Sequence, residues 1–371
     1  MNTKQPHITI ILGTRPEIIK LAPIIRTCEN RGISYSVIHT GQHYSENLNE
    51  VFFDQLELPQ PDYNLGVGSA SHGKQTGEMI IGIEEILLEE DTDVVLVQGD
   101  TNSVLAGTVA ATKLDCEVGH VEAGLRSFDR DMPEEKNRVI ADHTADYLFA
   151  PTEQSKEFLL EEGLPEERIF VTGNTVVDAV QQNRELATIK SSVIEDFSLT
   201  NTTYGLLTAH RAENVDNKEK FEKLLEGVEK VGSELDIEFL YPIHPRARGR
   251  VNAFNLSMPE HIKTIPSQDY IDFIRLQSGA DLILTDSGGV QEEACILGVP
   301  CVTLRENTER PETLDVGANV LAGTSPQSIL DRATEMVELD ENWQNPFGNG
   351  DAAQYIINCV SREATLIETP L

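Results

Sequence analysis

Short apolar runs alternate along the chain with longer segments in which apolar residues recur every three or four positions. The first run extends from His7 to Leu12, and the segment after it carries Ile18, Ala22 and Ile25 at helical spacing. Short runs that are apolar throughout are typical of strands buried on both faces of a parallel sheet. We therefore predict an α/β protein of alternating strands and helices. The strands expected in the first half are 7–12, 34–39, 94–98, 118–121, 147–150 and 169–171.

The same alternation starts again after a long polar segment, 173–196, which has helical character. Two Rossmann-like domains in tandem explain this repetition, and 371 residues are enough for two cores. We expect a first domain over 1–175 and a second, nucleotide-binding domain over 176–350. Residues 351–371 are expected to form a helix that crosses back to the first domain. The strands expected in the second half are 204–208, 237–241, 261–265, 281–285 and 300–304.

Charge narrows the range of functions. The chain has 62 acidic and 29 basic residues, which gives a net charge of −33 spread along the helices instead of gathered in a tail. Nucleic-acid binding needs a basic face and is therefore disfavoured. An acidic surface of this kind repels itself unless salt screens it, so we expect a halophilic, salt-adapted protein.

Cellular location is suggested by what the sequence does not contain. It shows no apolar stretch long enough to cross a membrane and no signal segment after Met1. Its five cysteines are scattered without CxxC spacing, as in proteins of a reducing compartment. We expect a cytoplasmic protein without a membrane partner.

Polar residues that directly follow predicted strands are the first candidates for chemistry, because ligands of open α/β sheets bind beyond the carboxyl ends of the strands. The first such loop, Gly13 to Glu17, opens a helix that carries Arg15 and Lys20. Free backbone N–H groups and two cations at one point would suit a phosphate.

Carboxylates follow two later strands of the first half. Asp100 is equally well explained as the N-cap of the next helix, whereas Glu122 precedes a small-residue turn and has no capping role. Glu134 and Glu135 open a further helix, where one of them needs no role beyond compensating the helix dipole.

A histidine and a glycine-rich turn follow predicted strands in the second half. His210 is placed to transfer a proton beside an anion. The turn Ser287-Gly288-Gly289 allows backbone and hydroxyl groups to approach a diphosphate closely. Glu293 in the following helix either compensates the helix dipole or binds a pair of ribose hydroxyls, and Arg310 adds a cation after the last predicted strand.

Known cofactor motifs do not occur in a suitable context. The first loop lacks the G-x-G-x-x-G spacing, and the one near match, 348–353, follows Asn345-Pro346 instead of a strand. There is no HExxH, CxxC or EF-hand pattern either. We expect neither a nicotinamide cofactor nor a tightly bound metal.

The chain resembles the non-hydrolysing UDP-N-acetylglucosamine 2-epimerases in seven motifs that occur in order along nearly its whole length. Each motif alone is weak, but the ordered set is specific. The motifs are GTRPEIIK at 13–20, GDTNS at 99–103, HVEAGLRS at 120–127, MPEEKNR at 132–138, AHRAEN at 209–214, DSGGVQEE at 286–293 and ERPE at 309–312.

The resemblance implies a glycosyltransferase-B architecture that binds UDP-GlcNAc between its domains and interconverts it with UDP-ManNAc for polysaccharide biosynthesis. It also implies a homodimer and no cofactor. The residues that match the family's catalytic positions are Asp100, Glu122, Glu134 and His210. The residues that match its contacts to the nucleotide sugar are Arg15, Lys20, Gln268, Phe273, Ser287, Gly288, Gly289, Glu293 and Arg310.

The chemistry of the substrate favours an elimination. The C2 proton of the sugar is not adjacent to a carbonyl, and without NAD no transient ketone can acidify it. The remaining route eliminates UDP to give 2-acetamidoglucal, reprotonates C2 from the other face and adds UDP back. This requires acid–base groups on both faces of the ring, for which Asp100, Glu122 and Glu134 are candidates without an assignment of the base. His210 would neutralise or protonate the departing diphosphate.

Other substrates and reactions also remain compatible with the sequence. The segment 40–45 resembles relatives that act on UDP-2,3-diacetamido uronic acids, whereas the GTRPE form of the first loop favours GlcNAc. The same segment departs from the regulatory UDP-GlcNAc site of many bacterial members, so allosteric activation is not implied, although Gln42 and His244 are present. A hydrolysing epimerase and a glycosyltransferase of the same fold would fit the predicted architecture as well. A catalytically silent nucleotide-sugar sensor would keep the Ser-Gly-Gly turn but lose the acids, whereas all four candidate catalytic residues are present here.

Overall fold

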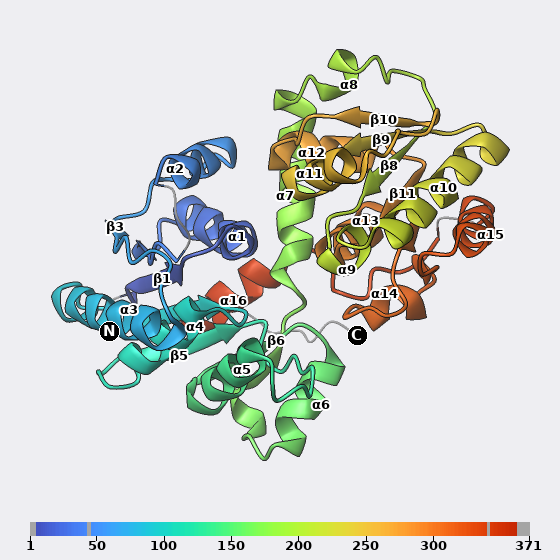
Figure 1. Cartoon of the computed structure of the whole chain (residues 1–371). Helices are drawn as coiled ribbons and strands as arrows, with labels where there is room; N and C mark the ends of the chain where they lie inside the picture. The colour runs from blue at the N-terminus through green and yellow to red at the C-terminus, as the bar shows by residue number, and fades with distance from the viewer. Residues whose placement is uncertain (1–4, 43–45, 340–341, 362–371) are drawn as a thin grey trace. The chain divides into compact units, whose positions relative to one another are not determined.

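The computed structural model describes residues 5–42, 46–339 and 342–361, so residues 43–45 of the segment 40–45 and residues 362–371 of the expected C-terminal helix lie outside it. The chain divides into two compact units. Unit 1 comprises Met1–Ala179 and Phe347–Leu371, and unit 2 comprises Val180–Pro346. Each unit is built on its own parallel sheet with flanking helices (Figure 1). The predicted fold class, α/β with two Rossmann-like domains, is confirmed.

The described part of unit 1 has these strands: β1 (Ile8–Leu12), β2 (Tyr35–His39), β3 (Tyr63–Asn64), β4 (Val94–Gln98), β5 (Glu117–Val121), β6 (Tyr147–Ala150) and β7 (Ile169–Val171). Its helices are α1 (Arg15–Arg31), α2 (Glu46–Gln55), α3 (His72–Glu89), α4 (Asn102–Ala111), α5 (Pro133–Thr144), α6 (Glu153–Glu161), the 3-10 helix η1 (Glu166–Arg168) and α16 (Ala352–Val360). The strand order is β3-β2-β1-β4-β5-β6-β7, and all neighbours are parallel. The central strands β1 and β4 are buried along their whole length, which explains their continuous apolar sequence.

The C-terminal helix α16 belongs to unit 1, where it packs on α1. Arg31 Nη1 donates to Asn358 Oδ1 at 2.7 Å, and the Ala353 N–H donates to Asp178 Oδ1 at 3.0 Å. The predicted return of the chain to the first domain is therefore observed. The apolar side chains that α16 buries are Ala352, Ala353, Ile356, Ile357 and Val360.

Unit 2 is entered through α7 (Thr175–Lys190), which starts in unit 1. Its strands are β8 (Tyr204–Thr208), β9 (Glu238–Pro242), β10 (Ile262–Ile265), β11 (Leu282–Thr285), β12 (Cys301–Thr303) and β13 (Asn319–Leu321). Its further helices are α8 (Val193–Asp196), α9 (Ala212–Val215), α10 (Lys218–Leu235), α11 (Pro245–Phe254), α12 (Tyr270–Ser278), α13 (Gly288–Leu297), α14 (Pro311–Asp315) and α15 (Pro326–Val337). The strand order is β10-β9-β8-β11-β12-β13, again all parallel.

Two edge strands, β3 and β13, were not expected from the sequence. They have two and three residues and each includes an asparagine, a residue depleted in strands, whereas the three-residue strand β7 is apolar throughout. In the portion of the chain that is described, none of the helices combines the length and the apolar character needed to cross a membrane.

Candidate active site

In the first loop of unit 1, Gly13 to Glu17, the side chain of Glu17 bonds back to the backbone. A Cβ on Gly13 would lie 2.0 Å from Thr40 Oγ1 and 2.3 Å from Ser103 Oγ, so the close packing of this loop requires glycine. The Gly13 N–H donates to Glu17 Oε2 at 2.9 Å, while the Thr101 hydroxyl donates to Glu17 Oε1 at 2.6 Å. The expectation that all of the loop's N–H groups are free for a phosphate is therefore wrong for Gly13.

The two cations of this loop have different surroundings. Arg15 is exposed, and its guanidinium carbon lies 5.7 Å from the centre of the Phe52 ring. Lys20 Nζ donates to both oxygens of Glu122, at 2.8 and 2.6 Å, with side-chain exposures of only 13% and 6%. Gln98, the last residue of β4, donates to the same carboxylate. Lys20 therefore links the first loop to the carboxylate after β5.

The backbone at Glu122 is in the left-handed region, with φ of 70°. This conformation is unfavourable for a residue with a Cβ and costs on the order of 1–3 kcal/mol. The Glu122 N–H donates to the Phe149 carbonyl at 3.1 Å, and the side chain is held by Lys20 and Gln98. Strain retained in this way is characteristic of functional positions.

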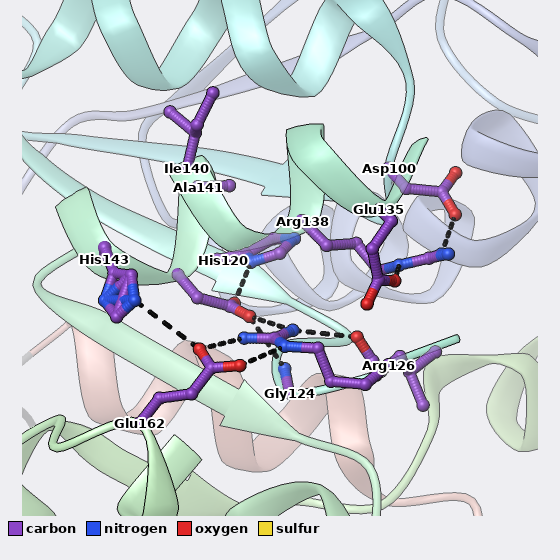
Figure 2. Close-up of polar contacts among 12 residues, drawn as sticks. Asp100, His120, Gly124, Arg126, Glu135, Arg138, Ile140, Ala141, His143 and Glu162 are labelled. Carbon is purple, nitrogen blue, oxygen red and sulfur yellow. Dashed lines mark hydrogen bonds and ion pairs between the residues drawn. The ribbon is translucent and has the colours of Figure 1, made fainter. Parts of the chain in front are cut away.

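Asp100 follows β4 and is paired with Arg138, whose Nη1 donates to Asp100 Oδ2 at 2.5 Å (Figure 2). The cap of helix α4 is Thr101, because its Oγ1 accepts from the N–H groups of Ser103 and Val104 at 3.1 and 3.4 Å. Asp100 is therefore not the N-cap. Arg138 lies within the MPEEKNR motif but was not singled out from the sequence.

The two glutamates that open α5 have separate environments. Glu135 is buried and accepts from the N–H groups of Ser127 and Phe128, both at 2.9 Å. Burial by itself raises the pKa of Glu135, but these donors outweigh it, and the pKa lies below its usual value. Glu134 is exposed. Glu135 thus anchors the preceding loop, which leaves Glu134 available for chemistry.

His210 in unit 2 is fixed by Asp286. The N–H groups of His210 and Arg211 donate to Asp286 Oδ2 at 3.0 and 2.9 Å, and His210 Nδ1 lies 3.2 Å from Asp286 Oδ1. Asp286 is fully buried, which by itself raises its pKa, but its hydrogen bonds with His210 outweigh burial and lower that pKa. The sequence showed Asp286 only as part of a motif; the structure makes it the anchor of His210.

A pocket of about 290 Å³ lies at the carboxyl ends of the strands of unit 2 and contains His210 in its lining. The His244 ring is 5.6 Å from the His210 ring, and burial together with the charge of His210 lowers the pKa of His244. The residues that line the pocket are Thr208, Ala209, His210, Pro242, His244, Ser267, Gln268, Phe273, Ser287 and Val290.

The predicted Ser-Gly-Gly turn coincides with the start of α13. Gly288 and Gly289 occupy its first turn, where backbone N–H groups have no partner within the helix, and a Cβ on Gly289 would meet nothing within 4 Å. Glu293 accepts from Gln277 Nε2 at 2.7 Å. Arg310 precedes α14, and its Nε lies 2.7 Å from Glu292 Oε1.

Known proteins match this chain along nearly its whole length. A family model described as UDP-N-acetylglucosamine 2-epimerase matches residues 26–361. The chain belongs to this family. It is 53% identical over 360 residues to the UDP-N-acetylglucosamine 2-epimerase of Methanocaldococcus jannaschii, covering 95% of this chain and 98% of that protein. The protein of the same name from Methanococcus maripaludis is 51% identical over 362 residues, with coverages of 96% and 98%.

A solved structure supports the same family fold. The crystal structure of the M. jannaschii UDP-GlcNAc 2-epimerase in complex with UDP-GlcNAc and UDP matches this chain with a TM-score of 0.82 and 53% identity. The match covers 96% of this chain and 99% of that chain. The sequence-based assignment to the epimerase family is therefore confirmed.

Within each unit, the residues that match the epimerase family's site are only partly grouped. Unit 1 brings Lys20 to Glu122, while Arg15 and Glu134 are exposed. In unit 2 the residues that share the pocket are His210, Gln268, Phe273 and Ser287. Glu293 and Arg310 are not in its lining. Among the residues that the structure describes, no three His, Cys, Asp or Glu side chains are arranged to hold a metal ion.

Proposed function

We propose that this epimerase family member interconverts UDP-GlcNAc and UDP-ManNAc by eliminating UDP and adding it back. The observation that carries the proposal is a pair of carboxylates at the ends of adjacent strands, each beside a cation. Glu122 follows β5 and is bound by Lys20, and Asp100 follows β4 and is bound by Arg138. The names of the relatives at 51% and 53% identity support GlcNAc over a diacetamido uronic acid as the sugar.

Unit 1 supplies the acid–base groups in this proposal. Removal of the C2 proton needs a carboxylate on one face of the sugar ring, and its return needs a second group on the opposite face. Asp100, Glu122 and Glu134 provide three carboxyl groups from two strand ends and one helix start. Water must be excluded from the glucal intermediate, and the low exposure of the Lys20–Glu122 pair is consistent with a dry reaction site.

Unit 2 binds and releases the nucleotide in this proposal. Gln268 and Phe273 line the pocket that Ser287 also borders, and the glycines of the Ser287–Gly289 turn leave space at the start of α13 for a diphosphate. His210 lines the same pocket with its Nδ1 side held by Asp286, so its Nε2 side is the one available to the departing diphosphate. Backbone donors and a histidine together would stabilise the charge that develops on the leaving group.

NMR of the chain incubated with UDP-GlcNAc alone in D₂O tests the proposal. We expect the anomeric signals of UDP-ManNAc to appear and deuterium to enter C2 of both sugars. Epimerisation without deuterium incorporation would exclude the elimination route. Release of free ManNAc and UDP would indicate a hydrolysing enzyme, and an absence of reaction until an acceptor is added would indicate a glycosyltransferase.

We also propose that the protein is a cytoplasmic homodimer adapted to high salt. The resemblance to the epimerase family supports a dimer, and the net charge of −33 supports salt adaptation. Light scattering of the purified chain in about 1 M KCl, where charge repulsion is screened, is expected to give the mass of two chains. A mass of one chain would contradict the dimer.

A further inference from the structure

We propose that His120 and Asp142 form a positioning pair that holds the backbone turns carrying Asp100 and Glu122. This inference rests on the proposed function, since it concerns the geometry of two of its carboxylates. Both members of the pair are fully buried. His120 lies on β5 two residues before Glu122, and Asp142 lies on α5.

The His120 ring reaches the turn of Asp100. Its Nε2 lies 2.8 Å from the carbonyl oxygen of Gly99, the residue directly before Asp100, and Gly99 has a φ of 83°. Its Nδ1 lies 2.6 Å from Asp142 Oδ1. The ring therefore spans from α5 to the turn after β4 while its own backbone belongs to β5.

The partners of the ring decide its protonation state. A carbonyl oxygen only accepts hydrogen bonds, so Nε2 must carry a proton, and an ionised carboxylate only accepts, so Nδ1 must carry one as well. His120 is therefore an imidazolium. Burial lowers the pKa of His120, but the charge of Asp142 outweighs this effect and raises it, with a smaller contribution from Glu122. Burial likewise opposes ionisation of Asp142, while His120 and Arg126 lower its pKa.

The second oxygen of Asp142 reaches the turn of Glu122. Asp142 Oδ2 accepts from the Gly124 N–H at 3.2 Å and from Arg126 Nη1 at 2.7 Å (Figure 2). Gly124 lies two residues after Glu122, and a Cβ there would be 2.3 Å from the Ser155 carbonyl oxygen. The carboxylate thus fixes this turn at a position that tolerates little displacement.

Arg126 is itself held in place, which keeps the network rigid. Its Nε and Nη2 donate to the two oxygens of Glu162, at 2.7 and 2.8 Å, and its side chain is 1% exposed. A buried ionic network is rarely more stable than apolar packing of the same volume. The network instead fixes the positions of two backbone groups, because its hydrogen bonds end on Gly99 O and Gly124 N.

Substitution of either member tests the proposal. In His120→Gln a single amide cannot serve both Gly99 O and Asp142, and in Asp142→Asn the charge that retains the imidazolium is lost. We expect kcat for UDP-GlcNAc to fall roughly 10- to 100-fold in both variants while KM changes little, as is typical of misplaced acid–base groups. The matched control is His261→Gln, which breaks a histidine–carboxylate pair of 2.9 Å with Glu229 in unit 2 and should leave kcat unchanged.

The protonation state of the wild-type ring gives a second test that does not depend on activity or on the folding of a variant. Selective ¹⁵N-histidine labelling should show one ring with two retained N–H protons and imidazolium shifts up to about pH 8, where an ordinary histidine is neutral. A neutral His120 ring, or a folded His120→Gln enzyme with wild-type kcat, would overturn the positioning role. An inactive wild-type protein that contains this imidazolium would instead count against the proposed reaction.

Discussion

Lys20 and Glu122 are joined by two hydrogen bonds from one ammonium nitrogen, although they are 102 positions apart in the sequence. Lys20 was expected among the contacts to the nucleotide sugar, yet it is bound to a carboxylate expected to act on the sugar ring. With exposures of 13% and 6%, neither charge can be fully hydrated if its partner is removed. We therefore expect a substitution at this pair to affect both the stability of the fold and the proposed reaction.

A double-mutant cycle measures that coupling. Lys20→Met and Glu122→Gln should each lower the free energy of unfolding by about 3 kcal/mol, because each leaves one buried charge without its partner. The double variant should recover much of that loss, since no unpaired charge remains, while epimerase activity stays lost. Urea denaturation and the NMR assay provide the two measurements. Stability losses that simply add would contradict a direct ion pair.

The adjacent glutamates of α5 should separate catalysis from stability. Glu134→Gln is expected to lower kcat roughly 100-fold with no change in Tm, as for loss of an acid–base group. Glu135→Gln should lower the free energy of unfolding by about 2 kcal/mol, because it impairs hydrogen bonds to the Ser127 and Phe128 N–H groups. Each variant is the control for the other. Equal effects of both on kcat and Tm would show that the two positions share one role.

Glu17 should give the protein a measurable pH dependence of stability. Burial raises its pKa from the usual 4.5 to about 7, although Thr101 and Gly13 hydrogen-bond to the carboxyl. A carboxyl group with a raised pKa favours the folded state most below its unfolded pKa, and this contribution is lost as pH rises through the folded pKa. Relative to Glu17→Gln, the free energy of unfolding of the wild type should therefore fall by about 3 kcal/mol between pH 4.5 and 7. Above pH 7 the difference between the two proteins should stay constant.

Urea denaturation of both proteins at a series of pH values between about 4.5 and 8 measures this difference. The Gln variant is the control because it keeps the size of the side chain and cannot titrate. A difference between the two proteins that does not change with pH would mean that folding does not shift the pKa of Glu17.

Salt should stabilise the folded chain. Repulsion among the residues that give the net charge of −33 is screened by added ions, so Tm should rise between low salt and about 1 M KCl. A non-ionic osmolyte at the same osmolarity is the control, since it does not screen charge. A Tm that does not rise with KCl would contradict salt adaptation.

The sequence predicted the sheets well because hydrophobic periodicity is a local signal. Strands such as β4 and β8 were predicted at the observed bounds, whereas β3 and β13 are short and include an asparagine, which interrupts the apolar run. Strand-end positions of Asp100 and Glu122 followed from the same reasoning. The bounds of the strands and the residues at their ends can be predicted without knowing which distant side chains are in contact.

Side-chain partners could not be predicted in the same way, because they depend on contacts between distant parts of the chain. No sequence spacing indicates that Lys20 pairs with Glu122, that Glu17 takes the Gly13 N–H, or that Asp286 holds His210. Arg138 is the residue that the sequence could most easily have indicated, since it lies one helical turn after Glu134 within the MPEEKNR motif. Positions four apart on a helix share a face, which is the signal that could have found it.

The division of the chain also affects the order in which the two units can fold during synthesis. Unit 2 is one continuous segment, 180–346, whereas unit 1 needs α16, which is translated after all of unit 2. During translation, the face of α1 that packs on α16 stays uncovered until residues 352–360 have left the ribosome. Completion of unit 1 is thus postponed until all of unit 2 has been translated, so the two units cannot be finished in the order in which the chain begins them.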